Sequence, residues 1–196
     1  MIKEFLKSVG NFILDTIETI VMALAMFAMV YLFLAQPHQV HGESMFPNFE
    51  DKEYLLTEKV SYRFREPKRG DVVIFKYPKA HEYDYIKRLI GLPEETILLE
   101  GEKVKIFNDQ HPEGFILEES YLNPKTKTIG RTVIKPGQKF HIPKDNYVMM
   151  GDNRERSSDS RAWGTVKREE LIGRAWLRYW PPQALAFIPK AEYKDK

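Results

Sequence analysis

The feature that most constrains this chain is an uncharged, mostly apolar segment near its N-terminus, residues 20–35. As an α-helix rising about 1.5 Å per residue, this segment would span roughly 24 Å. A bilayer hydrocarbon core is about 30 Å thick, and residues 17–19 can extend the helix because Glu18 can snorkel towards the headgroups. The segment is apolar on all sides, which favours contact with lipid over the alternative of a buried core helix. We therefore predict a transmembrane helix.

The residues before this segment indicate how it enters the membrane. Residues 1–19 mix charged side chains with apolar ones at near-helical spacing, as in a helix that lies on the bilayer and then enters it. Lys3 and Lys7 precede the apolar segment, whereas the next Lys or Arg is Lys52. Because positive charge favours the cytoplasmic side, we expect a cytoplasmic N-terminus and a domain on the extracytoplasmic side of the cell membrane.

A cleaved secretory signal is the alternative for an apolar N-terminal segment. Cleavage would need small residues at positions −3 and −1 of the cut site. With Ala35 at −1, Phe33 would occupy −3 and Pro37 would follow closely. This is a poor cleavage site, so we expect residues 1–36 to remain as a single-pass membrane anchor.

The composition limits the other functions that the chain could have. Residues 37–196 are enough for one globular domain with its own core. The 30 basic and 28 acidic residues leave a formal net charge of +2, and no basic stripe with interleaved aromatics occurs, so nucleic acid is not an expected partner. The absence of cysteine excludes disulfides and Cys-ligated metals. Without a His-Glu-x-x-His or similar motif, we expect no metal and no cofactor.

Beyond Pro37 the composition becomes that of a β-rich domain. Short runs of Val, Ile, Tyr and Phe are bounded by Gly, Pro, Asp and Asn, which predicts many short strands and few helices. The strands are expected near residues 39–42, 53–59, 71–77, 84–91, 96–99, 104–107, 132–134, 139–142, 147–150, 164–166 and 172–180. Residues 109–136 are polar, so we interpret them as an insertion or long hairpin at the sheet edge. Trp176 and Trp180 are expected in the core, with the bilayer interface as the alternative.

Ser44 is the candidate nucleophile. It lies in Gly-Glu-Ser-Met-Phe-Pro-Asn-Phe, residues 42–49, shortly after the apolar segment. A serine hydroxyl is a weak nucleophile at its own pKa and needs an activating base. Lys87 is the best candidate, because strand alternation places it on one face with Tyr85 and Leu89. The Lys87 side chain is therefore expected on the same face of the strand as its apolar neighbours.

A lysine acts as a base only when it is neutral. The ordinary lysine pKa of about 10.4 would have to fall to roughly 8 for useful activity near that pH. Burial among apolar side chains can lower it that far, and Tyr85, Leu89 and Phe75 are placed to provide such burial. The alternative for Lys87 is an exposed strand lysine, the fate of most lysines.

A Ser-His-Asp triad is the alternative to a lysine base. The chain has five histidines from which such a triad could be built: His38, His41, His81, His111 and His141. None lies in a motif-like setting, and each is more readily explained as a surface or loop residue. We therefore favour lysine.

Four short motifs follow the apolar segment along the chain: residues 42–49, 69–75, 83–91 and 151–161. By composition alone the last could be a charged surface turn. The run Lys-Arg-Leu-Ile-Gly-Leu-Pro, which begins at Lys87, and the run Gly-Asp-Asn-Arg-x-x-Ser-x-Asp-Ser-Arg, which begins at Gly151, are highly specific together. With these motifs behind a membrane anchor, the chain resembles the bacterial type I signal peptidases, especially the Gram-positive ones.

The resemblance implies a mainly β fold, in which an N-terminal transmembrane helix precedes an antiparallel β catalytic domain of the signal peptidase/repressor-protease type. It implies a serine endopeptidase that removes signal peptides from exported preproteins and cleaves after small residues at −1 and −3. Ser44 would be the nucleophile and Lys87 the general base. The partners would be signal peptides and the lipid bilayer, and we expect a monomer near the secretion translocon.

The resemblance also implies supporting roles. The Ser157 hydroxyl would hold the lysine amine in place, and Asp159 and Arg161 would form an ion pair that braces their loop. Gly151 would lie near the active site.

Further implied roles concern the loop of the nucleophile. Met45 and Pro47 would fix the turn that presents Ser44, whose backbone N–H would donate to the oxyanion. Gly42 stands where Gram-negative members carry a serine that completes the oxyanion hole. The second donor is therefore left open between a backbone N–H and a water molecule.

A substrate would bind as an added strand between residues 39–42 and 84–86, with shallow apolar pockets for alanine-sized side chains. The candidate pocket residues are Val40, Phe49, Phe75, Tyr85 and Ile86.

Two further alternatives stay open. A self-cleaving repressor-type Ser–Lys protease shares the chemistry, but it is cytosolic and carries a DNA-binding domain in place of the apolar segment. A catalytically silent, membrane-tethered homologue would bind exported proteins. It would be marked by loss of the serine or the lysine, and this chain keeps both.

Overall fold

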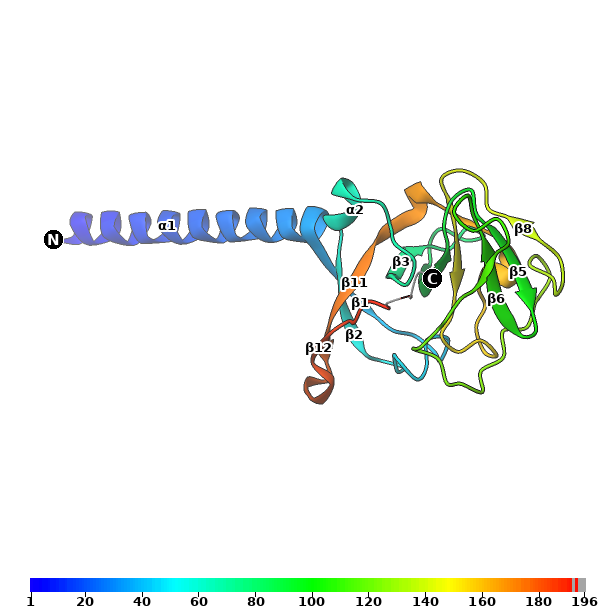
Figure 1. Ribbon diagram of the computed structural model, residues 1–196. Helices are drawn as coiled ribbons and strands as arrows, with labels where there is room; N and C mark the ends of the chain where they lie inside the picture. The colour runs from blue at the N-terminus through cyan, green and yellow to red at the C-terminus, as the bar shows by residue number, and fades with distance from the viewer. Residues whose placement is uncertain (192, 194–196) are drawn as a thin grey trace.

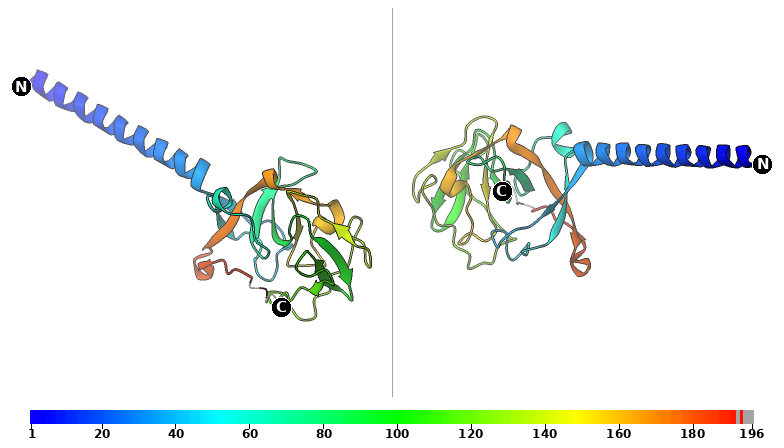
Figure 2. Two further views of the ribbon diagram at one scale, coloured as in Figure 1. Left: turned by 45° about the horizontal axis from the view of Figure 1, so that its top comes forward. Right: turned by 180° about the vertical axis from the view of Figure 1, so that it is seen from behind.

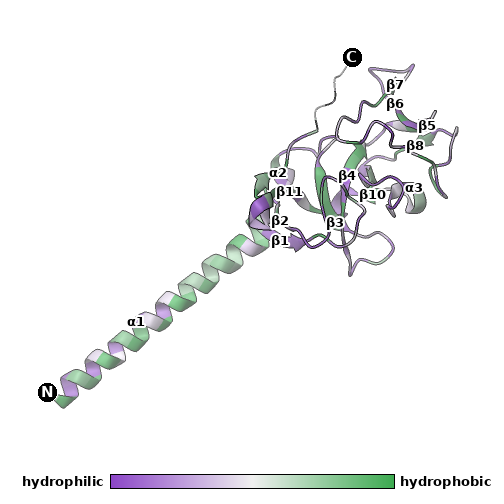
Figure 3. Ribbon diagram, turned by 90° about the horizontal axis from the view of Figure 1, so that it is seen from below, coloured by the Kyte–Doolittle hydropathy of each residue, from purple (hydrophilic) through white to green (hydrophobic). Residues whose placement is uncertain are grey.

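The computed structural model describes residues 1–191 and 193. A long helix, α1 (Ile2–Met29), continues through a π-helical turn, η1 (Val30–Leu34), and projects away from the rest of the chain (Figure 1). Residues 2–34 are long and apolar enough to cross a membrane. Hydrophobic residues occur along the whole helix, with hydrophilic ones mainly towards the N-terminus (Figure 3).

The chain then folds into two sheets whose neighbouring strands are antiparallel (Figures 1 and 2). The larger sheet has the order β1-β2-β11-β3-β4-β9-β10, with β12 paired to β11, and the smaller has the order β7-β6-β5-β8. The strands of the larger sheet are β1 (Ala35–Gln39), β2 (Tyr54–Glu58), β3 (Val72–Lys76), β4 (Asp84–Gly91), β9 (Asn146–Met150), β10 (Val166–Lys167), β11 (Leu171–Trp180) and β12 (Ala186–Phe187). Those of the smaller sheet are β5 (Thr96–Glu100), β6 (Lys103–Phe107), β7 (Phe115–Ile116) and β8 (Phe140–His141). The short helical segments are α2 (Ser61–Phe64), α3 (Ser160–Trp163), η2 (Arg168–Glu170) and η3 (Pro182–Ala184). The predicted mainly antiparallel β fold behind an apolar helix is confirmed.

Strand β3 is buried on both faces of the larger sheet, which explains its uninterrupted apolar run. Val72 and Ile74 pack into a cluster with Met45 on one side. Val73 and Phe75 pack on the other side, in a cluster that includes Leu89, Tyr147 and Trp163. A third cluster lies between the smaller sheet and the last part of β4.

The structure corrects two predicted strands. Residues 132–134 form no strand, because the N–H groups of Val133 and Ile134 both donate to the carbonyl of Arg161 rather than to a neighbouring strand. The strand predicted at residues 39–42 lies earlier, over β1. Gly42, with φ of 78°, turns the chain out of the sheet and into the next loop.

Other differences concern short strands and the C-terminal tryptophans. Strands β7 and β12 were not predicted, since two residues give no visible alternation. Trp176 and Trp180 were expected in the core, but they are 40% and 52% exposed. Residues 192 and 194–196, the end of the predicted domain, lie outside the described residues.

Candidate active site

Ser44 lies on the loop between β1 and β2, and backbone hydrogen bonds hold the two ends of this loop together. The N–H of Val40 donates to the carbonyl of Glu53 (2.8 Å), and the N–H of Lys52 donates to the carbonyl of Val40 (2.9 Å). The side chain of Met45 is fully buried, whereas Ser44 is half-buried. Met45 therefore anchors the loop in the core and leaves the neighbouring hydroxyl accessible.

The turn around Ser44 is closed by the N–H of Phe46, which donates to the carbonyl of Glu43 (3.2 Å). Pro47 is exposed and follows a cis peptide bond. The N–H of Gly42 donates to Asp51 Oδ1 (2.7 Å). This amide is therefore engaged within the loop and is not directed to a ligand.

Lys87 lies on β4, opposite Val73 of β3, and it is only 3% exposed. Its Nζ is 2.9 Å from Ser44 Oγ and donates to the carbonyl of Ile86 (2.8 Å). The amine and the hydroxyl are thus within hydrogen-bond distance, although 43 positions separate them in the sequence.

Burial is the main influence on the Lys87 amine. It lowers the pKa of Lys87 from 10.5 to about 8, against the opposing effect of the Asp159 and Asp152 charges. The Tyr85 ring lies beside the amine, with its centroid 5.1 Å from Nζ, and it packs against Phe75 of the same cluster. A lysine that is neutral near pH 8 can accept a proton from a hydroxyl 2.9 Å away.

Gly151 brings the polar loop of residues 151–161 against the Ser44 loop. A Cβ at this position would lie 2.2 Å from Ser157 Oγ and 2.4 Å from the carbonyl oxygen of Ser44. Only glycine permits this approach, because real Cβ atoms essentially never come within 3.0 Å of such neighbours. The loop therefore lies against the candidate nucleophile without a side chain between them.

Asp159 and Arg161 form a buried bidentate ion pair. Arg161 donates from Nε to Asp159 Oδ1 (2.8 Å) and from Nη2 to Oδ2 (2.7 Å). Burial raises the pKa of Asp159, but the Arg161 bonds and charge and the N–H of Gly151 outweigh it and hold that pKa below its ordinary value. The carboxylate is thus kept charged beneath the loop.

Ser157 is fully buried near these groups. Its hydroxyl is close enough to Asp159 to favour the charged carboxylate. Among the described residues, however, Ser157 Oγ forms no hydrogen bond of ordinary geometry, so the contact with the Lys87 amine that the resemblance implies is not made here.

Asp152, which was not predicted as a site residue, joins the two halves of the site. Arg88, the neighbour of Lys87, donates from Nε to Asp152 Oδ1 (2.8 Å) and from Nη2 to Oδ2 (2.6 Å). Asn48, on the Ser44 loop, donates to Asp152 Oδ2 (2.9 Å). One buried carboxylate therefore links the strand of Lys87 to the loop of Ser44. Arg88 itself could have indicated such a carboxylate. Strand alternation places Arg88 on the opposite face from Lys87, and an arginine that is buried needs a charged partner.

Part of the predicted insertion at residues 109–136 also supports the site. The guanidinium of Arg88 stacks on Tyr121, with its Cζ 3.9 Å from the ring centroid. The carbonyl of Tyr121 accepts a bond from Asn48 (3.0 Å). Glu119 pairs with Arg154 of the 151–161 loop (2.7 Å from Nη1 to Oε2). Residues 109–136 show no hydrophobic periodicity, so their contacts with the site could not be predicted from the sequence.

A groove of about 770 Å³ passes Ser44 and Lys87. Its walls include His38, Gln39 and Glu43 on one side and residues 83–87 on the other. Within the described part of the chain, β1 pairs with β2 alone, and residues 84–87 of β4 pair with β3 but not with β9. Two strand edges therefore face the groove.

The candidate pocket residues divide into two groups. Tyr85 and Ile86 line the groove. Val40, Phe49 and Phe75 are at most 4% exposed and pack in the core clusters. They lie outside the groove lining because each points into the interior from its own element.

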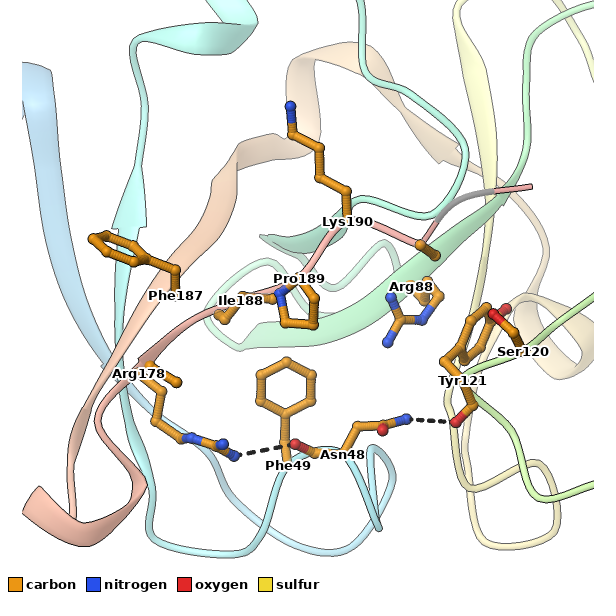
Figure 4. A pocket seen from close by; sticks show the side chains of 12 residues that line it. Asn48, Phe49, Arg88, Ser120, Tyr121, Arg178, Phe187, Ile188, Pro189 and Lys190 are labelled. Carbon is orange, nitrogen blue, oxygen red and sulfur yellow. Dashed lines mark hydrogen bonds between the residues drawn. The ribbon is translucent and has the colours of Figure 1, made fainter. Parts of the chain in front are cut away.

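A second cavity, of about 460 Å³, lies under the C-terminal segment (Figure 4). Phe49, Ile188 and Pro189 provide its apolar wall, and Asn48 and Arg88 contribute polar groups. Its arginines already have carboxylate partners: Arg88 pairs with Asp152 and Arg178 with Glu53. Neither Ser44 nor Lys87 lines it, so we do not regard it as the reaction site.

The five histidines are spread over the domain. His38 contacts Thr57 (2.9 Å) and lies 3.5 Å from Asp84 at the groove wall. In the part of the chain that the structure describes, no histidine hydrogen-bonds Ser44, and no group of three or more His, Asp or Glu could hold a metal.

The chain is similar to proteins with assigned names. Residues 13–180 match the family described as signal peptidase, peptidase S26. A signal peptidase I from Leptolyngbya laminosa is 34% identical over an alignment of 181 positions that covers 88% of this chain and 82% of that protein. Signal peptidase IB from Staphylococcus aureus (strain COL) is 34% identical over an alignment of 181 positions that covers 86% of this chain and 90% of that protein. A crystal structure of a signal peptidase I from Enterococcus faecalis V583 aligns with 28% identity and a TM-score of 0.43, covering 56% of this chain and 97% of that one.

Proposed function

The chain belongs to the signal peptidase family, peptidase S26, and we propose that it is a membrane-bound serine endopeptidase that removes signal peptides from exported preproteins. One observation carries the proposal most directly. Ser44 Oγ and Lys87 Nζ are 2.9 Å apart, and the amine is almost completely buried. This is the arrangement that a hydroxyl nucleophile with an amine base requires.

Acylation uses only these two side chains. Ser44 Oγ attacks the carbonyl carbon of the scissile bond while neutral Lys87 takes the hydroxyl proton. The negative charge moves to the carbonyl oxygen, to which the N–H of Ser44 donates. The C–N bond then breaks, the leaving amine takes the proton from the Lys87 ammonium, and the signal peptide stays on Ser44 as an ester.

Deacylation repeats the proton transfer with water. Neutral Lys87 takes a proton from a water molecule, which attacks the ester carbonyl, and the proton then returns to Ser44 Oγ as the acid product leaves. Because Asp51 engages the N–H of Gly42, we favour a water molecule as the second donor to the oxyanion.

The groove supports binding of the substrate as an extended strand. The free edges of β1 and of residues 84–87 flank it and offer backbone groups to a substrate from both sides. Tyr85 and Ile86 line the groove beside Lys87. We therefore propose that small side chains at −1 and −3 fit there and larger ones do not.

Attachment to the membrane is supported by the single apolar helix of residues 2–34. We propose that this helix crosses the bilayer once, with its N-terminus in the cytoplasm, because Lys3 and Lys7 precede it. The peptidase would then act on the extracytoplasmic side as a monomer, near the secretion translocon.

The alternative of a silent, membrane-tethered homologue has less support, since both groups of the proposed dyad are present and in contact. A repressor-type protease is disfavoured by the apolar helix at the N-terminus.

The test is cleavage of a preprotein with Ala at −3 and −1 by the detergent-solubilised full chain. We expect one cut after the −1 residue, retained activity with Ser at −1 and no activity with Leu at −1. Equal turnover of the Ala and Leu substrates would contradict the small pocket. Absence of any cleavage would favour the alternative of a catalytically silent homologue.

A further inference from the structure

The long helix is joined to the sheet domain without a linker. β1 begins at the residue that follows η1, and α2 lies beside the end of the helix (Figures 1 and 2). The N–H of Lys59 donates to the carbonyl of Leu34 (2.9 Å), and Lys59 Nζ donates to the carbonyl of Tyr31 (3.4 Å). The turn from β2 to α2 is therefore held against the last turn of the apolar helix.

This turn carries two basic side chains, Lys59 and Arg63. Burial and then the Arg63 charge lower the pKa of Lys59, against the opposing effect of the Asp84 charge. Among the described residues, neither forms an ion pair with a carboxylate. The nearby carboxylates have other partners, since Glu58 binds Arg174 and Asp84 binds Lys76.

An aromatic ring of the helix lies near each cation. Lys59 Nζ is 5.9 Å from the ring centroid of Tyr31, and Arg63 Cζ is 5.5 Å from that of Phe33. Phe64, next to Arg63, is 85% exposed. Exposed aromatic residues beside basic ones at the end of an apolar helix are typical of the interface between hydrocarbon and headgroups.

We propose that Lys59 and Arg63 form a binding site for the phosphate of an anionic phospholipid, such as phosphatidylglycerol, in the leaflet next to the sheet domain. The proposal rests on the proposed membrane function of the chain. A phosphate would neutralise these two cations, which both lie beside the helix end and, among the described residues, form no ion pair with a carboxylate. Phe64 lies on α2 next to Arg63 and would insert among the acyl chains.

The site fixes the height of the sheet domain above the bilayer. The helix end, the β2–α2 turn and β1 are joined by direct hydrogen bonds, and β1 forms one edge of the groove. Binding of the headgroup therefore positions the groove for a substrate that is itself inserted in the membrane.

A purely structural role must be distinguished, because a cation near the C-terminal end of a helix is also favoured by the helix dipole. Such a role would not depend on the lipid headgroup. The test therefore compares vesicles of phosphatidylcholine alone with vesicles that also contain phosphatidylglycerol.

The experiment measures kcat/KM of the reconstituted full chain for a membrane-inserted preprotein in both vesicles. The variants are Lys59→Gln/Arg63→Gln and a control with the same loss of charge, Lys103→Gln/Lys125→Gln. These control residues are exposed and lie outside the groove and the helix junction. We expect phosphatidylglycerol to raise kcat/KM of the parent and the control. We expect the Lys59/Arg63 variant to lose most of this increase, since each basic residue at an anionic surface is worth roughly fivefold in binding.

Cleavage of a short soluble peptide in detergent separates this inference from the proposed function. Equal peptide turnover by all three proteins shows that each is folded and active, whereas no turnover by the parent refutes the proposed function instead. Native mass spectrometry should find phosphatidylglycerol bound to the parent and the control but not to the Lys59/Arg63 variant.

Three results would overturn the lipid site. One is an undiminished phosphatidylglycerol effect in the Lys59/Arg63 variant. Another is an equal loss in both kinds of vesicle, which would assign the two cations to helix capping. The third is an equal increase in kcat/KM when inorganic phosphate is added in place of phosphatidylglycerol, which would assign the site to a free anion.

Discussion

Replacing Lys87 with Met should make the folded chain more stable at neutral pH while removing its activity. Burial lowers the pKa of Lys87 from 10.5 to about 8, and each pKa unit corresponds to about 1.4 kcal/mol. Holding this amine charged in the folded state therefore costs about 3 kcal/mol at pH 7. Methionine has a similar length and no charge, so it avoids this cost. It loses two hydrogen bonds, to Ser44 and Ile86, worth about 1 kcal/mol each.

The sign of the pH dependence follows from the two pKa values. Between pH 8 and 10.5 the folded state binds fewer protons at Lys87 than the unfolded state, so the stability of the parent rises with pH across this window. Below pH 8 the cost is constant. The variant should therefore be more stable than the parent by about 1 kcal/mol at pH 7. This difference should move by about 3 kcal/mol in favour of the parent by pH 10.5.

Urea unfolding in one detergent, followed by tryptophan fluorescence at pH 7 and 10.5, measures this difference. Trp163 is a suitable reporter because it packs in the apolar cluster on the Lys87 face of the sheet. Lys103→Met, at an exposed position, is the control and should show no comparable pH-dependent change. A Lys87→Met difference that is the same at both pH values would refute the argument that burial suppresses the charge.

Two further variants test the supports of the site. Gly151→Ala should lower kcat by about 100-fold, because a displacement of about 1 Å has that effect and the new methyl group would meet Ser157 and the Ser44 carbonyl. A normal kcat in this folded variant would show that the close approach is unimportant. Asp152→Ala should destabilise the chain by about 3–5 kcal/mol, since it leaves the buried Arg88 charge without its carboxylate partner. Adding Arg88→Met should restore much of the loss in thermal unfolding, and a failure to do so would contradict this explanation.

The β-rich fold could be predicted because its strands carry strong local signals. Residues 84–91 were expected as one strand, and β4 has those bounds. The same alternation placed Lys87 with Tyr85 and Leu89, which lie with Phe75 on one face of the sheet. Strand β7 has two residues, and pairing with β6 rather than any pattern of its own creates it.

The tertiary contacts of the site could not be predicted from spacing. Asp152, Asn48 and Tyr121 come from three distant segments, and each contact depends on how those segments pack. Two of the candidate pocket residues lie outside the groove lining for a related reason. Val40 and Phe49 are close to Ser44 in sequence, but their side chains point into the core. Proximity in the sequence does not show which way a side chain points.

The most direct test of the proposed dyad is the pH dependence of cleavage by the parent, Ser44→Ala and Lys87→Ala between pH 6 and 10. The substrate is a peptide with Ala at −3 and −1. We predict that both variants are inactive and that kcat/KM of the parent rises tenfold per pH unit at low pH and levels off near pH 8, where Lys87 loses its proton. Retained activity in Lys87→Ala, or a parent rate that still rises through pH 10, would contradict a buried, neutral lysine as the base.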